Sequence, residues 1–260
     1  MKSKRLFFLI GVGCFILFVF FSYLVHKNIF THFDFDTTVR LQNNISRRFD
    51  DPFSLLSDIG KFEPMILLLI VFLFIRRRLL GIIALSLSAS FYFFLVASIR
   101  LGSGRYELNS LQIGIIILWA IILLIIIRKK LWGIIILFIF GALHGFELFG
   151  KFFVDHLPPP EFMLRAKHLI DFPQFHVRSE FSYPSGHSAR AAFLSIFLGI
   201  IIFRSKKLTQ TQKLIIIGVL ACYDIAMFTS RVYLGEHWIS DVIGGGLLGI
   251  SLGLLSTLVI

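Results

Sequence analysis

Residues 214–260 read LIIIGVLACYDIAMFTSRVYLGEHWISDVIGGGLLGISLGLLSTLVI. The stretch holds two long apolar segments, 214–230 and 238–260, joined by a short polar connection. A membrane-spanning helix needs about 20 mainly apolar residues, and backbone groups in lipid must form hydrogen bonds within their own segment. The stretch therefore predicts two transmembrane helices whose connection lies at the membrane surface.

The rest of the chain has the same character. Its 260 residues are 57% hydrophobic and include 31 Phe, and a soluble domain of this length would expose large apolar patches. Apolar segments occur at residues 6–25, 62–75, 79–99, 111–127, 131–150, 185–203, 214–230 and 238–260. The sequence predicts an all-α, polytopic membrane helix bundle of about eight transmembrane helices, which forms one integral membrane domain over residues 1–260.

The charged residues are distributed unevenly. Of the 26 Lys and Arg residues, 13 lie in residues 1–5, 76–78, 128–130 and 204–213, which contain no acidic residue. The positive-inside rule places these segments, and with them both termini, in the cytoplasm. We therefore interpret the net charge of +11 as a signal of membrane orientation. We expect a bacterial cytoplasmic membrane protein without a nucleic-acid partner.

Polar patches fall in the connections that this orientation places outside. They cover residues 151–160, 183–190 and 230–241. In the last patch, His237 and Asp241 are four residues apart, so on a helix they would share a face. The carboxylate can accept the imidazole Nδ1–H and leave Nε2 free as a nucleophile, while Arg231 can bind two phosphate oxygens.

The other two patches supply further groups for binding an anion. Pro184 precedes an expected helix start, with Ser185 and Gly186 in the first turn, and a helix N-terminus favours an anion. Gly186 lets the backbone approach a ligand closely, and His187 can donate a proton to a leaving alkoxide. Lys151 places a positive charge at the end of another expected helix.

These patches resemble the three-part signature of the type 2 phosphatidic acid phosphatase (PAP2) superfamily, which also includes vanadium haloperoxidases. The signature is Lys, six residues, Arg-Pro; then Pro-Ser-Gly-His; then Ser-Arg, five residues, His, three residues, Asp. Residues 184–187 match the second part, and Ser230, Arg231, His237 and Asp241 match the third.

The resemblance covers about residues 140–250, where we expect a PAP2-like catalytic core. The first part of the signature departs from the family, because the Arg counted from Lys151 falls on Pro158 and only Pro159 agrees. Losing one charge-assisted phosphate contact typically costs about 1.5–3 kcal/mol, which would weaken an enzyme rather than abolish it. The candidates for replacing this cation are His156, Arg165 and Arg178, and the sequence does not choose among them.

The resemblance implies a metal-independent acid phosphatase without cofactor. His237 would attack phosphorus to form a phosphohistidine, oriented by Asp241, and His187 would protonate the leaving lipid alcohol and then activate water. The phosphate oxygens would be bound by Lys151, Ser185, Gly186 and Arg231. The expected substrate is a membrane lipid phosphate, with polyprenyl diphosphate such as undecaprenyl diphosphate, phosphatidylglycerophosphate and phosphatidic acid all open. A lipid phosphotransferase and a weakened lipid-phosphate-binding or transport protein are the alternatives, and the oligomeric state stays open.

Several further polar residues and glycines have structural interpretations. Glu147 precedes Lys151 by one turn and can pair with it, while Arg190 can support the site or pair with Asp224. In residues 26–61, we interpret the acidic side chains as part of a solvated loop that includes an amphipathic interfacial stretch, rather than as a cation site: Asp34, Asp36, Asp50 and Asp51. A further set of glycines predicts close helix packing in the last span: Gly244, Gly245, Gly246 and Gly249.

Overall fold

The computed structural model describes residues 2–61, 64–66, 68–69, 131–167 and 180–259. Its helices are α1 (Lys2–His26), α2 (Thr31–Asn44), η1 (Arg47–Phe49), α3 (Asp50–Ile59), α7 (Leu131–Phe153), η2 (Glu161–Met163), α8 (Gly186–Arg204), α9 (Gln210–Tyr233) and α10 (Ile239–Ser256). This part of the chain contains no β-strand, so the predicted all-α class is confirmed.

Helices α1, α7, α8, α9 and α10 are long and apolar enough to cross a membrane. They correspond to five of the predicted spans. The predicted spans 79–99 and 111–127, and most of 62–75, lie outside the described residues. The chain is an integral membrane helix bundle, and the count of eight spans stays a prediction.

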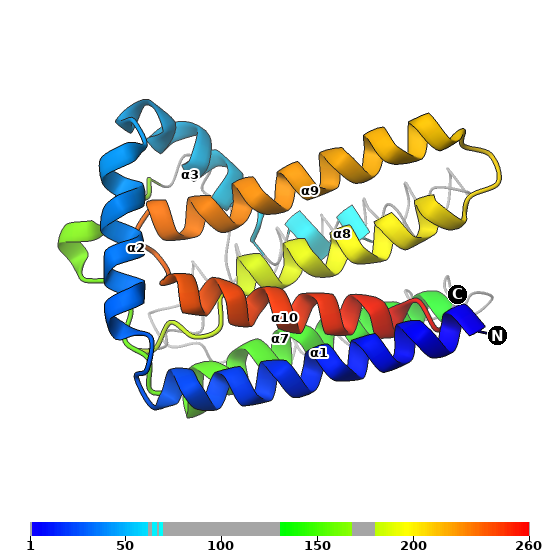
Figure 1. Ribbon diagram of the computed structural model, residues 1–260, viewed down its shortest axis with the longest axis horizontal. Helices are drawn as coiled ribbons and strands as arrows, with labels where there is room; N and C mark the ends of the chain where they lie inside the picture. The colour runs from blue at the N-terminus through cyan, green and yellow to red at the C-terminus, as the bar shows by residue number, and fades with distance from the viewer. Residues whose placement is uncertain (1, 62–63, 67, 70–130, 168–179, 260) are drawn as a thin grey trace, which may run out of the picture.

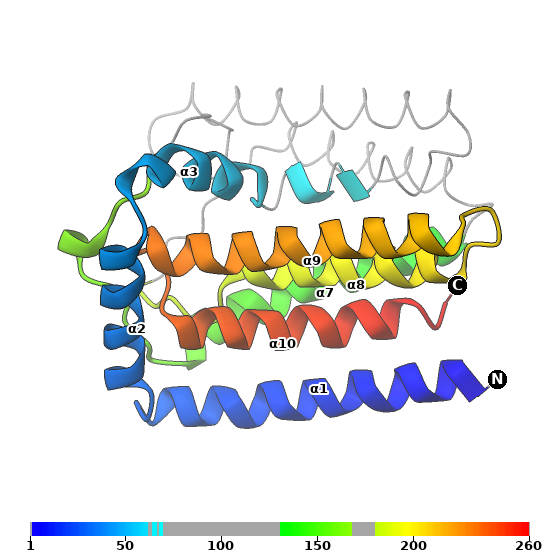
Figure 2. The same ribbon diagram turned by 45° about the horizontal axis from the view of Figure 1, so that its top comes forward.

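Helix α10 packs between α1 and α8, while α9 lies along α8 (Figures 1 and 2). The contact between α8 and α10 is close because glycines face it. A Cβ added at Gly245 would lie 2.2 Å from the Ser185 carbonyl oxygen, and one at Gly249 would lie 2.2 Å from that of Ala189. The predicted role of these two glycines in close helix packing is confirmed.

The Gly249→Ala variant should therefore be less stable than the wild type by about 1–3 kcal/mol, since the new methyl group forces the two backbones apart. Thermal unfolding in detergent measures the difference. The matched control is Gly199→Ala on α8, where an added Cβ meets nothing within 4 Å. Equal unfolding temperatures for the two variants would contradict this account of the packing.

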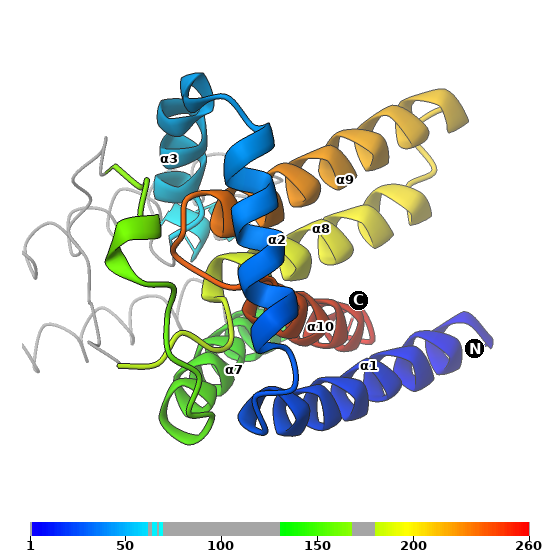
Figure 3. The same cartoon turned by 60° about the vertical axis from the view of Figure 1, so that its left-hand side comes forward.

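Helix α2 crosses one end of the bundle, where it contacts α9 and α10, and α3 packs against α9 (Figure 3). The two termini lie together at the opposite end, where Lys4 Nζ donates to the Leu258 carbonyl oxygen at 3.1 Å. The end covered by α2 contains the C-terminal end of α7, the start of α8 and the α9–α10 connection. The three polar patches of the sequence therefore meet at one end of the bundle.

Residues 26–61 are not simply a solvated loop, because α2 and α3 occupy this segment; the predicted amphipathic interfacial stretch stays a prediction. Asp36 and Asp51 are exposed, but Asp34 and Asp50 are buried. Asp34 accepts hydrogen bonds from Ser240 N at 2.9 Å and Ser240 Oγ at 2.8 Å. A buried carboxylate needs such donors, and α10 supplies them only after the chain has folded.

Candidate active site

The second polar patch forms the start of α8, as the sequence predicts. Ser185 is the N-cap, and its Oγ accepts from Ser188 N at 3.5 Å and from Ser188 Oγ at 3.1 Å. Its own backbone N donates to the Asp241 carbonyl oxygen at 3.0 Å. This bond ties the start of α8 to the first turn of α10, so the second and third patches are held together.

Glu147 lies against the same helix start. A Cβ on Gly186 would lie 2.0 Å from Glu147 Oε1, so the glycine is required here for the approach of a carboxylate of the protein itself. The carboxylate lies 3.3 Å from Lys151 Nζ, which confirms the predicted pair. It also lies 2.7 Å from Arg190 Nη1 and 3.0 Å from His144 Nδ1. Opposite charges therefore compensate the buried Glu147.

Arg190 thus pairs with Glu147 rather than with Asp224, which instead accepts a hydrogen bond from Ser195 Oγ at 2.8 Å. Arg190 Nε also donates to the Gly60 carbonyl oxygen at 3.2 Å, just beyond α3. A Cβ on Gly60 would lie 3.0 Å from His187 Cδ2. Residues after α3 therefore pack against the proposed general acid, a contact that the sequence pattern does not indicate.

Arg231 lies in the last turn of α9 and is fully buried. Its Nη1 donates to Ser57 Oγ, and its Nη2 pairs with Glu236. Its Nε has no hydrogen-bond partner in the described part of the chain, and the same holds for the buried Nε2 of His187. A buried polar group without a partner calls for an explanation, such as a catalytic role or a bound ion, and an anion would suit the guanidinium.

The turn after α9 brings His237 back toward Arg231. Gly235 has φ +70°, a conformation that costs glycine little, and a Cβ there would lie 2.2 Å from the Met163 carbonyl oxygen. The backbone N of both Glu236 and His237 donates to the Arg231 carbonyl oxygen at 3.2 Å. A tight turn therefore fixes the position of His237 relative to Arg231.

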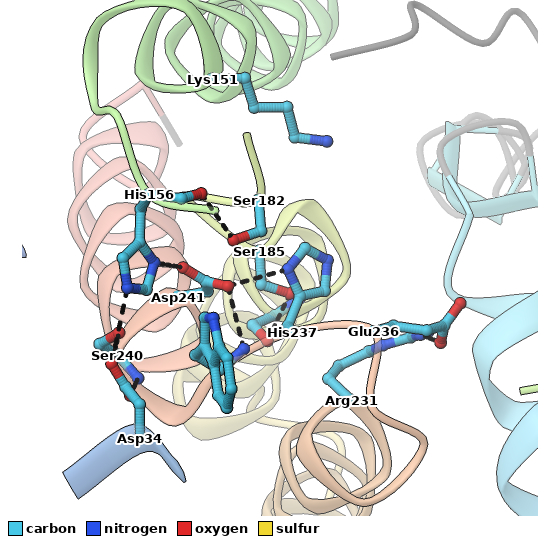
Figure 4. Close-up of polar contacts among 12 residues, drawn as sticks. Asp34, Lys151, His156, Ser182, Ser185, Arg231, Glu236, His237, Ser240 and Asp241 are labelled. Atoms are coloured by element: carbon cyan, nitrogen blue, oxygen red, sulfur yellow. Dashed lines mark hydrogen bonds and ion pairs between the residues drawn. The ribbon is translucent and has the colours of Figure 1, made fainter. Parts of the chain in front are cut away.

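His237 Nδ1 lies 3.4 Å from Asp241 Oδ2, and both residues are buried. The predicted proximity is correct, but the reason differs from a shared helix face. His237 precedes α10, whose N-cap is Trp238, and Asp241 Oδ2 accepts from Trp238 N at 3.0 Å. The carboxylate thus caps the helix and faces the histidine at the same time (Figure 4).

A second histidine contacts the same carboxylate. His156 Nδ1 lies 2.8 Å from Asp241 Oδ1, and its Nε2 lies 3.6 Å from Asp34 Oδ2. Figure 4 shows the ring between the two carboxylates. His156 is one of the three residues that could replace the Arg missing from the first part of the family signature. Its ring is turned toward carboxylates.

The other two candidates for that replacement are placed differently. Arg165 lies over the Tyr233 ring, 5.0 Å from its centroid, and Arg165 Nη1 donates to the Gln42 carbonyl oxygen at 3.1 Å. Arg178 lies outside the described residues. Pro158 itself is exposed. None of these contacts shows which residue takes the place of the Arg that the family signature has at position 158.

The local fields shift the pKa values of these groups in opposite directions. Burial lowers the pKa of His237, Asp241 raises it, and the charges of Arg231 and Lys151 lower it, with a net decrease. For His156, burial also lowers the pKa, but the hydrogen bond and charge of Asp241 and the charge of Asp34 give a net increase. Compared with a free imidazole, His237 therefore favours its neutral form and His156 favours its protonated form.

Sequence patterns did not reveal Asp34, Glu236 and Ser57 as neighbours of the site, and indicated His156 only as a possible phosphate ligand. His156 and Asp241 are 85 residues apart, and Asp34 and Ser240 are 206 apart. A single buried acid or histidine belongs to no motif of fixed spacing, so the sequence alone does not show that it lies at the site.

Comparison with known proteins points to one family. The sequence model of the PAP2 superfamily matches residues 129–260. Phosphatidylglycerophosphatase B of Bacillus subtilis (strain 168) is 28% identical over 125 residues, which cover 48% of this chain and 56% of that relative. The alignment thus spans little more than half the length of the curated relative.

The fold has a counterpart among solved structures. The crystal structure of the first transmembrane PAP2-type phosphatidylglycerolphosphate phosphatase, from Bacillus subtilis, superposes with a TM-score of 0.56 at 19% identity. The superposition covers 95% of this chain and 94% of the other. At this identity the match supports the fold.

Proposed function

Because the chain belongs to the PAP2 superfamily and is related to a lipid phosphatase, we propose that it hydrolyses a lipid phosphate through a phosphohistidine on His237. The observation that carries this proposal is the contact of His237 Nδ1 with the buried Asp241, beside a buried Arg231 whose Nε has no hydrogen-bond partner in the described residues. The pair supplies an oriented imidazole, and the arginine supplies charge for the phosphate.

In the first step, Nε2 of His237 attacks phosphorus while the bond from phosphorus to the lipid oxygen breaks. His187 donates its proton to that leaving oxygen. In the second step, water attacks phosphorus, the P–N bond breaks, and His187 takes a proton from the water. The groups assigned to the phosphate oxygens are Lys151, Ser185, the Gly186 N–H and Arg231.

The positive-inside rule places this end of the bundle on the extracytoplasmic side, with both termini in the cytoplasm. A lipid substrate would keep its chains in the bilayer and present its phosphate at the ends of the spans. The named activity of the Bacillus relative makes phosphatidylglycerophosphate the first substrate to test. Phosphatidic acid and polyprenyl diphosphate are the other candidates.

The test is phosphate release by the purified protein in detergent, with chelator present, from each of these three lipids. Release that persists with chelator and disappears in His237→Ala would support the proposed reaction. Release only when a divalent ion is added back would contradict metal independence. Addition of an alcohol-bearing lipid acceptor separates the transferase alternative, which would yield a phosphorylated acceptor in place of free phosphate.

The pH dependence gives a further prediction. His237 must be unprotonated to attack, and its lowered pKa means that this form persists in mild acid. The acid limb of kcat/KM should therefore have its midpoint below about pH 6.5. Initial rates from about pH 4 to about pH 10 measure the profile. An acid limb with its midpoint above about pH 6.5 would count against this role of His237.

A further inference from the structure

Three donors surround the carboxylate of Asp241. His237 Nδ1 lies 3.4 Å from Oδ2, Trp238 N lies 3.0 Å from Oδ2, and His156 Nδ1 lies 2.8 Å from Oδ1. The contact to His156 is the shortest of the three. Because the two oxygens of a carboxylate rotate together, a partner that holds Oδ1 also determines where Oδ2 points.

The structure holds His156 in place through both its backbone and its ring. Its carbonyl oxygen accepts from Ser182 N at 2.9 Å and from Ser182 Oγ at 3.1 Å. Next to it, the Leu157 carbonyl oxygen accepts from Trp238 Nε1 at 2.7 Å. On the far side of the ring, Asp34 faces Nε2 at 3.6 Å and is itself bound by Ser240. The imidazole is therefore a buried link between α2, the loop after α7, and α10.

The charges favour a proton on the nitrogen that faces Asp241. Two carboxylates flank the ring, and an imidazolium donates from both nitrogens. Burial opposes the charged form, but Asp241 and Asp34 outweigh it and raise the pKa of His156. A cation here also reduces the repulsion between the two carboxylates, so Asp241 can stay ionised next to His237.

We propose that His156 is a positioning residue of the reaction, which holds the Asp241 carboxylate so that it orients His237. This inference rests on the proposed function, because it names what supports the nucleophile of that reaction. Both ring nitrogens of His156 face carboxylates, so its contribution is to the nucleophile rather than to the phosphate. The chain lacks the first-motif Arg at Pro158, but two residues earlier it supplies a side chain with this different task.

Three substitutions separate this role from general packing. In His156→Asn the amide nitrogen takes the place of Nδ1 and can still donate to Asp241, whereas in His156→Gln it reaches the place of Nε2, near Asp34. His156→Ala removes both. Partners that orient a histidine from behind typically contribute about 10- to 100-fold, as in metal sites, so His156→Gln and His156→Ala should lower kcat by about that factor with KM nearly unchanged.

His156→Asn should keep kcat within about threefold of the wild type, since it preserves the hydrogen bond that the proposal requires. The matched control is His32→Asn, an exposed histidine on α2. Equal losses in the Asn and Gln variants, a loss in KM alone, or no loss in any variant would overturn the proposal. If the Ala variant does not fold, the test is the difference in kcat between the Asn and Gln variants, provided that these two unfold at the same temperature.

A second readout does not depend on turnover. In protein labelled with ¹⁵N-histidine, the His237 signal is identified by its loss in His237→Ala. We expect it to report the Nδ1–H tautomer in the wild type and in His156→Asn, and a mixture of tautomers in His156→Gln. An unchanged His237 signal in His156→Gln would overturn the positioning role. No phosphate release from any lipid by a wild type that shows the expected signals would instead reject the proposed function alone.

Discussion

Alanine in place of His237 is expected to lower kcat by about 10⁴- to 10⁶-fold, the largest effect of any single change in this chain, since removal of a covalent nucleophile has effects of this order in other enzymes. His237 is buried next to Asp241 and follows the turn that starts at Arg231. The residues on either side of His237 are Glu236 and Trp238, so the turn contains no second imidazole that could replace it. Phosphate release at saturating lipid measures the loss.

The control for this change is His32→Ala, which removes an exposed imidazole on α2 and should leave kcat within about twofold, as surface substitutions usually do. Rapid quenching with labelled lipid adds a direct check on the intermediate. The wild type should carry label that resists alkali and is lost in acid, as expected of a phosphohistidine, and His237→Ala should carry none. Label retained by the variant would assign the nucleophile to another residue.

The second large effect is expected for Asp241→Asn, which should lower kcat by about 10³- to 10⁴-fold, by analogy with the aspartate that orients the histidine of serine proteases. The carboxylate accepts from three donors: His156, His237 and Trp238. An amide has only one acceptor oxygen, so its NH₂ group must face either His156, at the place of Oδ1, or both His237 and Trp238, at the place of Oδ2. If it faces His237, the imidazole must place its proton on Nε2, which blocks attack on phosphorus.

KM should change much less than kcat in Asp241→Asn, because the proposed mechanism assigns the phosphate oxygens to other residues. Asp36→Asn is the matched control, since Asp36 is exposed on α2 and the same chemical change there should leave kcat within about twofold. Thermal unfolding must be compared as well, because Asp241 also caps α10. A variant of normal stability that keeps more than about a tenth of wild-type kcat would contradict the orienting role of the carboxylate.

Much of the fold follows from local sequence. Spanning helices were predicted at 185–203 and 238–260, and α8 and α10 occupy these segments, because a long apolar stretch in lipid must satisfy its own backbone bonds. The start of α8 at Gly186 was also predictable, since Ser185 is a favoured N-cap and Pro184 ends the preceding loop. These features depend on residues that are neighbours in the chain.

Local sequence was less informative where a segment is polar. Residues 26–61 contain acids and arginines in alternation, which suits a solvated loop as well as an amphipathic helix. The structure forms α2 and α3 there, and buries Asp34 against Ser240. The donor that makes this burial favourable belongs to α10, so no pattern within the segment could indicate it.

The same distinction between local sequence and tertiary structure applies to the candidate site. The sequence by itself determined which residues carry the family signature, and it predicted that His237 and Asp241 would be close, because side chains four residues apart share a face of a helix. The structure brings them together in a different way, since His237 precedes α10. Only the tertiary structure decided what surrounds them: Glu147 against Gly186, Ser57 on Arg231, and His156 between two carboxylates. Side chains that meet across many tens of residues have no periodicity to reveal them, and helix packing alone brings them within hydrogen-bonding distance.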